Sequence, residues 1–146
     1  MYSGLLHLHN FLRWVILIAL LINIVKLLAG NKNLGLSKIL LISAHITLVL
    51  GLYQYFAGPW GFQSISTSGM AVVMKDSALR FWAVEHITGM IAAIALITVG
   101  HVKLKKGGKP KTTAILYMIA LLLILAVVPW PFREAIARPW FPGMPA

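Results

Sequence analysis

Long apolar runs alternate with short polar segments along the whole chain. Four of the runs approach or exceed the about 20 residues that a helix needs to cross roughly 30 Å of hydrocarbon. These runs cover residues 5–29, 37–57, 79–102 and 113–128. The pattern predicts an all-α fold, an integral membrane four-helix bundle that forms a single transmembrane domain over residues 1–146.

Two further segments contain apolar residues without being long enough to span. Residues 58–78 are expected to form an outer loop, in which the stretch GMAVVM predicts an interfacial or re-entrant turn. Residues 129–146 combine prolines with Trp and Phe, a composition that suits a tail lying on the membrane surface. We therefore expect four crossings and not five.

The charged residues are few and unevenly placed. Only 11% of the chain is charged, against about 25% in an ordinary soluble domain, and 60% is hydrophobic. The connections after the first and third runs carry lysines and no acid, which indicates that they are cytoplasmic and that both termini are on the non-cytoplasmic side. The net charge of +10 then indicates orientation in the lipid bilayer, not a nucleic-acid partner. The lysines concerned are Lys26, Lys32, Lys38, Lys103, Lys105, Lys106, Lys109 and Lys111.

The residue types exclude several kinds of chemistry. The chain has no cysteine, so it holds no disulfide, thiolate metal site, iron–sulfur cluster or covalently attached haem. It has three acidic residues and no zinc-protease, phosphate-loop or nucleophile-elbow motif. Nothing supports a hydrolase or a transferase, and redox chemistry needs a non-covalently bound cofactor.

Ionisable residues inside the spans are the candidates for function, because they are costly in hydrocarbon and usually face the bundle interior. At about 100° per residue, His9 and Arg13 share one face of the first span, whereas His7 points about 160° away from His9. Interfacial histidines with solvated edges are the alternative reading of His7 and His9. At the far end of the third span, His101 is typical of a capping or snorkelling residue.

Depth along the helices decides which of these groups can meet. At about 1.5 Å per residue, Arg13 and Glu85 lie at similar depths, which predicts a structural ion pair between them. His9 and His86 also agree in depth within about one helical turn. His45 lies about 9 Å deeper than His86 and is the alternative partner.

Two imidazoles from different helices at one depth, with an apolar slot between them, match the donor set of a b-type haem. Arg13 and Arg80 are nearby cations for its propionates. Gly89 shares a face with His86 and leaves room either for a neighbouring helix or for a flat macrocycle. The predicted cofactor-binding residues are His9, His86, His45, Arg13, Arg80 and Gly89, with His9 and His86 as the iron ligands and His45 as the alternative.

The stretches GLLHLHNFLRW, LLISAHITLVLGLYQYF and LRFWAVEHITGM resemble those of small four-span bacterial membrane proteins described as cytochrome-b-like. The resemblance covers most of the chain from Gly4 to Phe132. It implies haem b, electron transfer and a multi-pass location in the bacterial inner membrane. It also implies that His9, His45 and His86 fall at the family's histidine positions, with Arg13 and Glu85 at its polar partners.

Three functions compete on these grounds. The first is a haem b protein that relays electrons, with a quinone as its partner. The second is a non-catalytic accessory subunit of a larger membrane complex or homo-oligomer. The third, a proton or metal permease, needs a polar track through the membrane, and beyond His45 only Asn23 and Ser43 continue one.

Overall fold

The computed structural model describes residues 2–142, and within that range the chain is helical and contains no strand. Four helices are long and apolar enough to cross a membrane, which confirms the predicted all-α fold with four helices of spanning length. The third candidate span begins slightly earlier than expected, at Ser77. The long helices are α1 (Tyr2–Leu28), α2 (Leu34–Ala57), α6 (His86–Lys105) and α7 (Pro110–Val127).

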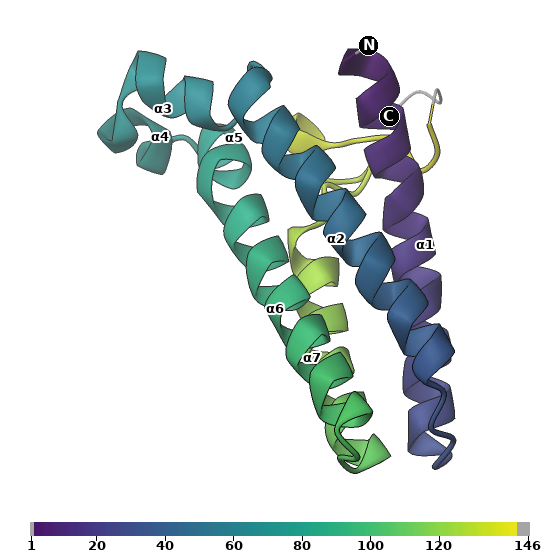
Figure 1. Ribbon diagram of the computed structural model, residues 1–146. Helices are drawn as coiled ribbons and strands as arrows, with labels where there is room; N and C mark the ends of the chain where they lie inside the picture. The colour runs from purple at the N-terminus through teal and green to yellow at the C-terminus, as the bar shows by residue number, and fades with distance from the viewer. Residues whose placement is uncertain (1, 143–146) are drawn as a thin grey trace.

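The four long helices form an up-and-down bundle (Figure 1). Helix α1 packs on α2 and α7, and α6 packs on the same two helices, so α1 and α6 face each other diagonally across the bundle. The α1–α2 and α6–α7 connections lie together at what we term the lysine-rich end. The start of α1 and the segment after α7 lie together at the opposite end, which we term the tail end.

Local sequence explains the two turns at the lysine-rich end. The side chain of Asn33 caps α2 by accepting a hydrogen bond from the backbone N–H of Leu36 (3.1 Å). Gly107 adopts a φ of 90°, and Pro110 occupies the first turn of α7, where its missing N–H costs nothing. Both connections are therefore short, and they hold their helix pairs antiparallel.

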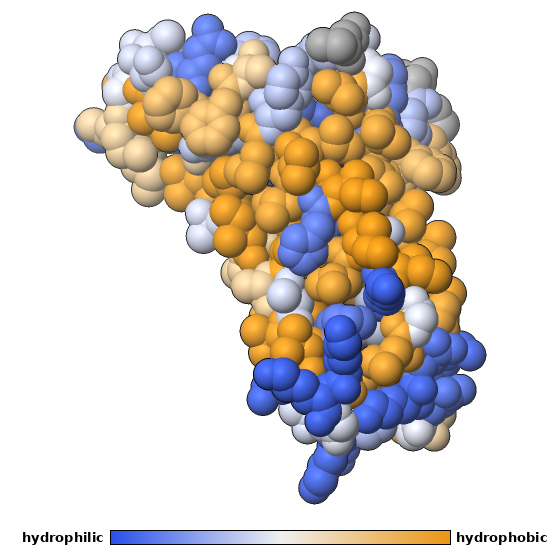
Figure 2. All heavy atoms as spheres, viewed as in Figure 1, coloured by the Kyte–Doolittle hydropathy of each residue, from blue (hydrophilic) through white to orange (hydrophobic). Residues whose placement is uncertain are grey.

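The bundle buries apolar side chains along its axis and exposes others all round. Leu20, Leu40 and Ile97 are fully buried. A Cβ added to Gly100 would lie 2.8 Å from Cε1 of Tyr117, so this glycine lets α6 and α7 approach closely. On the face shown in Figure 2, hydrophobic residues form a broad belt, and hydrophilic residues gather at the lysine-rich end. A bilayer solvates such a belt, whereas water does so poorly.

The segment expected to form an outer loop is instead mostly helical. It folds into α3 (Phe62–Ser68), α4 (Met70–Lys75) and α5 (Ser77–Arg80), which lie at the tail end beside α2 and α6 (Figure 1). Gly69 joins α3 and α4 at a φ of 82°, and Asp76 caps α5. None of these helices is long enough to span.

Two irregular elements complete the tail end. A π-helical turn, η1 (Phe81–Glu85), joins α5 to α6. After α7 the chain continues to residue 142 as an extended segment, here called the tail, which is interrupted by the short 3-10 helix η2 (Glu134–Ile136). Residues 143–146 of the expected surface segment lie outside the described residues.

Candidate functional site

Two histidines meet in the bundle interior near the tail end. His9 comes from α1 and His86 from α6, the two helices that face each other diagonally. Their ring centroids are 6.4 Å apart and their planes are inclined by 62°. The structure therefore brings together the pair predicted from depth.

Hydrogen bonding fixes one of these rings. The Nδ1–H of His86 donates to the carbonyl oxygen of Val127 over 2.7 Å, and because a carbonyl only accepts, the other ring nitrogen is left with a free lone pair. Metal-binding histidines commonly have this arrangement. The ring of His9 packs against α2, where a Cβ on Gly51 would lie 3.2 Å from its Cε1.

Two cavities adjoin the histidine pair. The first encloses about 100 Å³ and extends along α2 toward Gln54 and Trp60. The second encloses about 200 Å³ and extends toward α7 and the tail, reaching Arg13 and Pro139. Both are mostly apolar, and their shared lining includes His9, Thr47, Trp82, His86, Met90 and Arg138.

Unpartnered polar atoms collect at these cavities. Among residues 2–142, three buried side-chain nitrogens have no hydrogen-bond partner, namely Nδ1 of His9, Nε of Arg13 and Nε2 of Gln54. All three side chains line one or both cavities. Because buried polar groups are normally satisfied, their concentration around open space indicates a ligand site.

Two arginines contribute positive charge to the second cavity. Arg13 binds the tail through Nη2, which donates to the carbonyl oxygens of Pro139 (3.1 Å) and Trp140 (2.8 Å). Arg138 comes from the tail itself, and its guanidinium lies 4.6 Å from the ring centre of Trp82. Burial lowers the pKa of Arg138 below its ordinary value.

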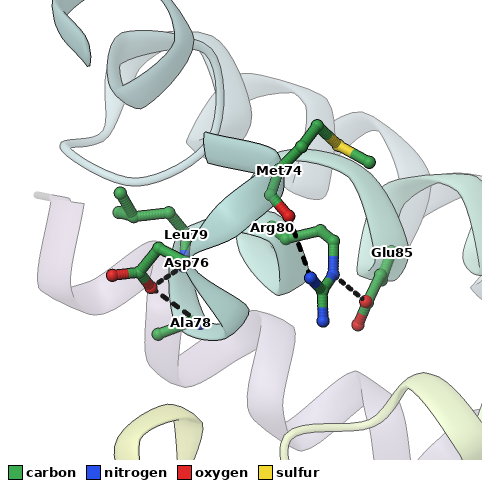
Figure 3. A network of polar contacts seen from close by, with 6 residues as sticks. All are labelled: Met74, Asp76, Ala78, Leu79, Arg80 and Glu85. Atoms are coloured by element: carbon green, nitrogen blue, oxygen red, sulfur yellow. Dashed lines mark hydrogen bonds and ion pairs between the residues drawn. The ribbon is translucent and has the colours of Figure 1, made fainter. Parts of the chain in front are cut away.

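The predicted ion pair between Arg13 and Glu85 is wrong. Figure 3 shows Glu85 paired with Arg80, whose Nε lies 2.8 Å from Oε1 of the carboxylate. The π-helical turn explains the change, because its i to i+5 hydrogen bonding brings residues five apart onto one face. Arg13 has the tail carbonyls as its partners instead.

Arg80 is also misplaced in the predicted haem site. Its guanidinium is held by Glu85 and donates to the carbonyl oxygen of Met74 over 2.9 Å (Figure 3), and the residue lines neither histidine cavity. Arg138, and not Arg80, lines the two histidine cavities. The sequence signal for Arg138 was weak, since only the neighbouring aromatic residues of the tail marked it.

His45 does not face His86. It lies on the exposed side of α2, where its Nδ1–H donates to the carbonyl oxygen of Leu41 over 2.8 Å. Thr47, two positions further on, lines both cavities beside the histidine pair. A shift of two residues turns a side chain by about 200° around a helix, so depth alone was misleading here.

Gly89 serves helix packing and lines neither cavity. A Cβ at this position would lie 2.5 Å from Cγ1 of Val127, so the glycine is needed for the approach of α7 to α6. Of the two uses that the sequence left open for Gly89, the structure thus supports the neighbouring helix. The same contact brings Val127 close enough to accept the hydrogen bond from His86.

His101 is not a cap but part of a second polar cluster, at the lysine-rich end. Its Nδ1 lies 2.8 Å from Oγ of Ser37, which also hydrogen-bonds the hydroxyl of Tyr117. All three residues are buried. The cluster ties α2, α6 and α7 together, and neither histidine cavity reaches it.

The donor set limits what the histidine pair can hold. Within the described part of the chain, no group of three or more His, Cys, Asp or Glu side chains is placed to hold a metal ion. Two imidazoles alone suit a metal that arrives with further ligands, as in a haem.

Comparison with protein-family models, with curated proteins and with solved structures finds no match to this chain.

Proposed function

We propose that this protein binds haem b between α1 and α6 and relays electrons within the membrane. The observation that carries the proposal is the facing pair of His9 and His86 with a cavity extending on each side. Two imidazoles whose ring centroids are 6.4 Å apart could hold one metal ion between them.

The chain's own residues supply the binding and the environment. His9 and His86 would hold the iron, and the Val127 carbonyl orients His86. Arg13 and Arg138 offer positive charge to the two carboxylates of the cofactor. The apolar side chains around the cavities exclude water from the site. The bound group would supply one-electron chemistry at its iron.

The same proposal includes an orientation of the protein in the membrane, which the distribution of lysines indicates. The lysine-rich end faces the cytoplasm, so the histidine pair lies in the outer half of a bacterial inner membrane. A permease is not supported, because Ala93, Ile94 and Ile97, which lie between His86 and His101 along α6, are buried and apolar.

An absorption spectrum of the purified protein, oxidised and then reduced with dithionite, tests the proposal. We expect sharp reduced α and Soret bands, which His86→Ala should abolish. His45→Ala is the matched control and should keep the bands, because this side chain is exposed on α2 and lines neither cavity. Protein that stays colourless after expression with added haem would contradict the proposal.

One observation favours the second candidate, an accessory subunit. His45 lies exposed midway along α2, where hydrocarbon solvates an imidazole poorly, so contact with another protein chain would stabilise it. A larger complex or a homo-oligomer supplies such a contact. Loss of a co-purifying chain, or dissociation of an oligomer, on His45→Leu substitution would support this function.

A further inference from the structure

The cavity along α2 contains a polar group that the proposed haem ligation does not use. The Nε2 amide nitrogen of Gln54 is buried, has no partner within residues 2–142, and belongs to a side chain that lines this cavity. The hydroxyl of its neighbour Tyr55 already donates to the carbonyl oxygen of Ala83 over 2.8 Å. The cavity therefore suits a ligand that brings an acceptor oxygen to Gln54.

The position of Gln54 separates this region from the histidine pair. His9 packs against Gly51, and Gln54 lies three residues further along α2, which is about one helical turn nearer the tail end. A ligand at Gln54 would thus occupy the part of this cavity nearer the tail end and adjoin a group held by His9 and His86.

The walls around Gln54 favour a flat, lipophilic ligand. Tyr55, Trp60 and Trp82 line this cavity, and aromatic faces pack well against planar rings. Trp60 and Leu6 also reach the molecular surface, with 45% and 37% of their areas exposed, so the region is open to the apolar belt. A ligand dissolved in the bilayer can enter here.

We propose that this region binds the head group of a membrane-soluble quinone, with the Nε2–H of Gln54 donating to one of its carbonyl oxygens. The role of this quinone as an electron partner rests on the proposed haem function, whereas its binding needs only the residues named here. A phospholipid ester carbonyl shares the acceptor chemistry of a quinone, but it has no ring for the aromatic walls.

Saturable quenching of tryptophan fluorescence by a short-tailed benzoquinone or naphthoquinone, corrected for quenching of free tryptophan in the same detergent, measures binding. Loss of the Gln54 hydrogen bond in Gln54→Leu should weaken the affinity for the quinone about tenfold. Gln63→Leu is the matched control, because Gln63 is exposed on α3, and it should bind as the unaltered protein does. Trp60→Leu should also weaken binding.

The outcomes separate this inference from the haem proposal. Quenching that never saturates, or equal affinity of the Gln54→Leu and Gln63→Leu proteins, overturns the quinone site even where the haem bands are present. Loss of haem in Gln54→Leu also overturns it, because the residue would then hold the haem. Displacement of the quinone by added phospholipid assigns the site to a lipid carbonyl and overturns the inference. Colourless protein that binds quinone through Gln54 contradicts the haem proposal alone.

Discussion

The two ends of the bundle both bury histidine, but they satisfy it differently. At the lysine-rich end Ser37 hydrogen-bonds both His101 and Tyr117, and neither histidine cavity reaches these residues. At the tail end His9 and Arg13 each keep a buried nitrogen without a partner in the described chain, beside open space. A satisfied polar cluster stabilises the fold, whereas an unsatisfied one beside a cavity indicates a ligand.

Substituting the histidine at each end should reveal the largest difference between the two ends. His9→Ala removes one of two proposed iron ligands, so we expect loss of the reduced α and Soret bands. His101→Ala should keep those bands and lower the melting temperature in detergent, because it disrupts only the contact with Ser37. Visible spectra and thermal unfolding of the same samples provide the measurements. Bands that survive His9→Ala but not His101→Ala would reverse the assignment of the two ends.

Disrupting the contact between Gly89 and Val127 should have the next largest effect, a loss of stability. Gly89→Ala places a methyl group 2.5 Å from Cγ1 of Val127 and should destabilise the protein by about 1–3 kcal/mol. Val127→Ala removes the clashing methyl groups, so the double variant should recover part of that loss. Thermal unfolding of the two single variants and the double variant measures the recovery. A double variant that loses the sum of the single effects would show that the two residues are not in contact.

The polar cluster at the lysine-rich end predicts a smaller, purely structural effect. Tyr117→Phe removes the hydroxyl that hydrogen-bonds Ser37 and should cost about 1 kcal/mol of stability with no change in the spectrum. Tyr53→Phe is the control, because Tyr53 is 43% exposed, and it should change neither quantity. A spectral change in Tyr117→Phe would mean that the two ends are coupled.

The surface ion pair between Arg80 and Glu85 should have the smallest effect on stability. Arg80 and Glu85 keep 36% and 41% of their side chains exposed, so a double-mutant cycle between them should give a coupling below about 1 kcal/mol. The cycle between Arg13 and Glu85 should be additive within about 0.5 kcal/mol, because the two residues have different partners. Strong coupling between Arg13 and Glu85 would restore the ion pair that the sequence predicted.

Hydrophobic run length was enough to predict the four long helices, and helix depth was enough to predict that His9 and His86 meet. Both quantities depend on regular helix geometry alone. Those predictions held because the described part of α1 is one uninterrupted helix as far as Leu28.

The remaining site residues depended on features that regular helix geometry does not contain. The π-helical turn redirected Glu85 to Arg80, and the fold of the tail brought Arg138 into the second cavity. The prediction of His45 as an alternative ligand was wrong for a different reason. The packing of α2 on α1 and α6 sets the rotation of α2, and this rotation leaves His45 exposed. The sequence did not identify Gln54 as a ligand-binding residue, because it differs from the exposed Gln63 only in lining a cavity.

The attachment of the tail to Arg13 sets an order for the biogenesis of the site. The second cavity is lined by Pro129, Arg138 and Pro139, all from the segment that the ribosome makes after the four spans. The bundle can therefore insert and pair its helices while that cavity is still uncovered. Closure comes last, when Arg13 captures the carbonyl oxygens of Pro139 and Trp140. A ligand of the second cavity could therefore enter most easily between membrane insertion of α7 and the docking of the segment that follows it.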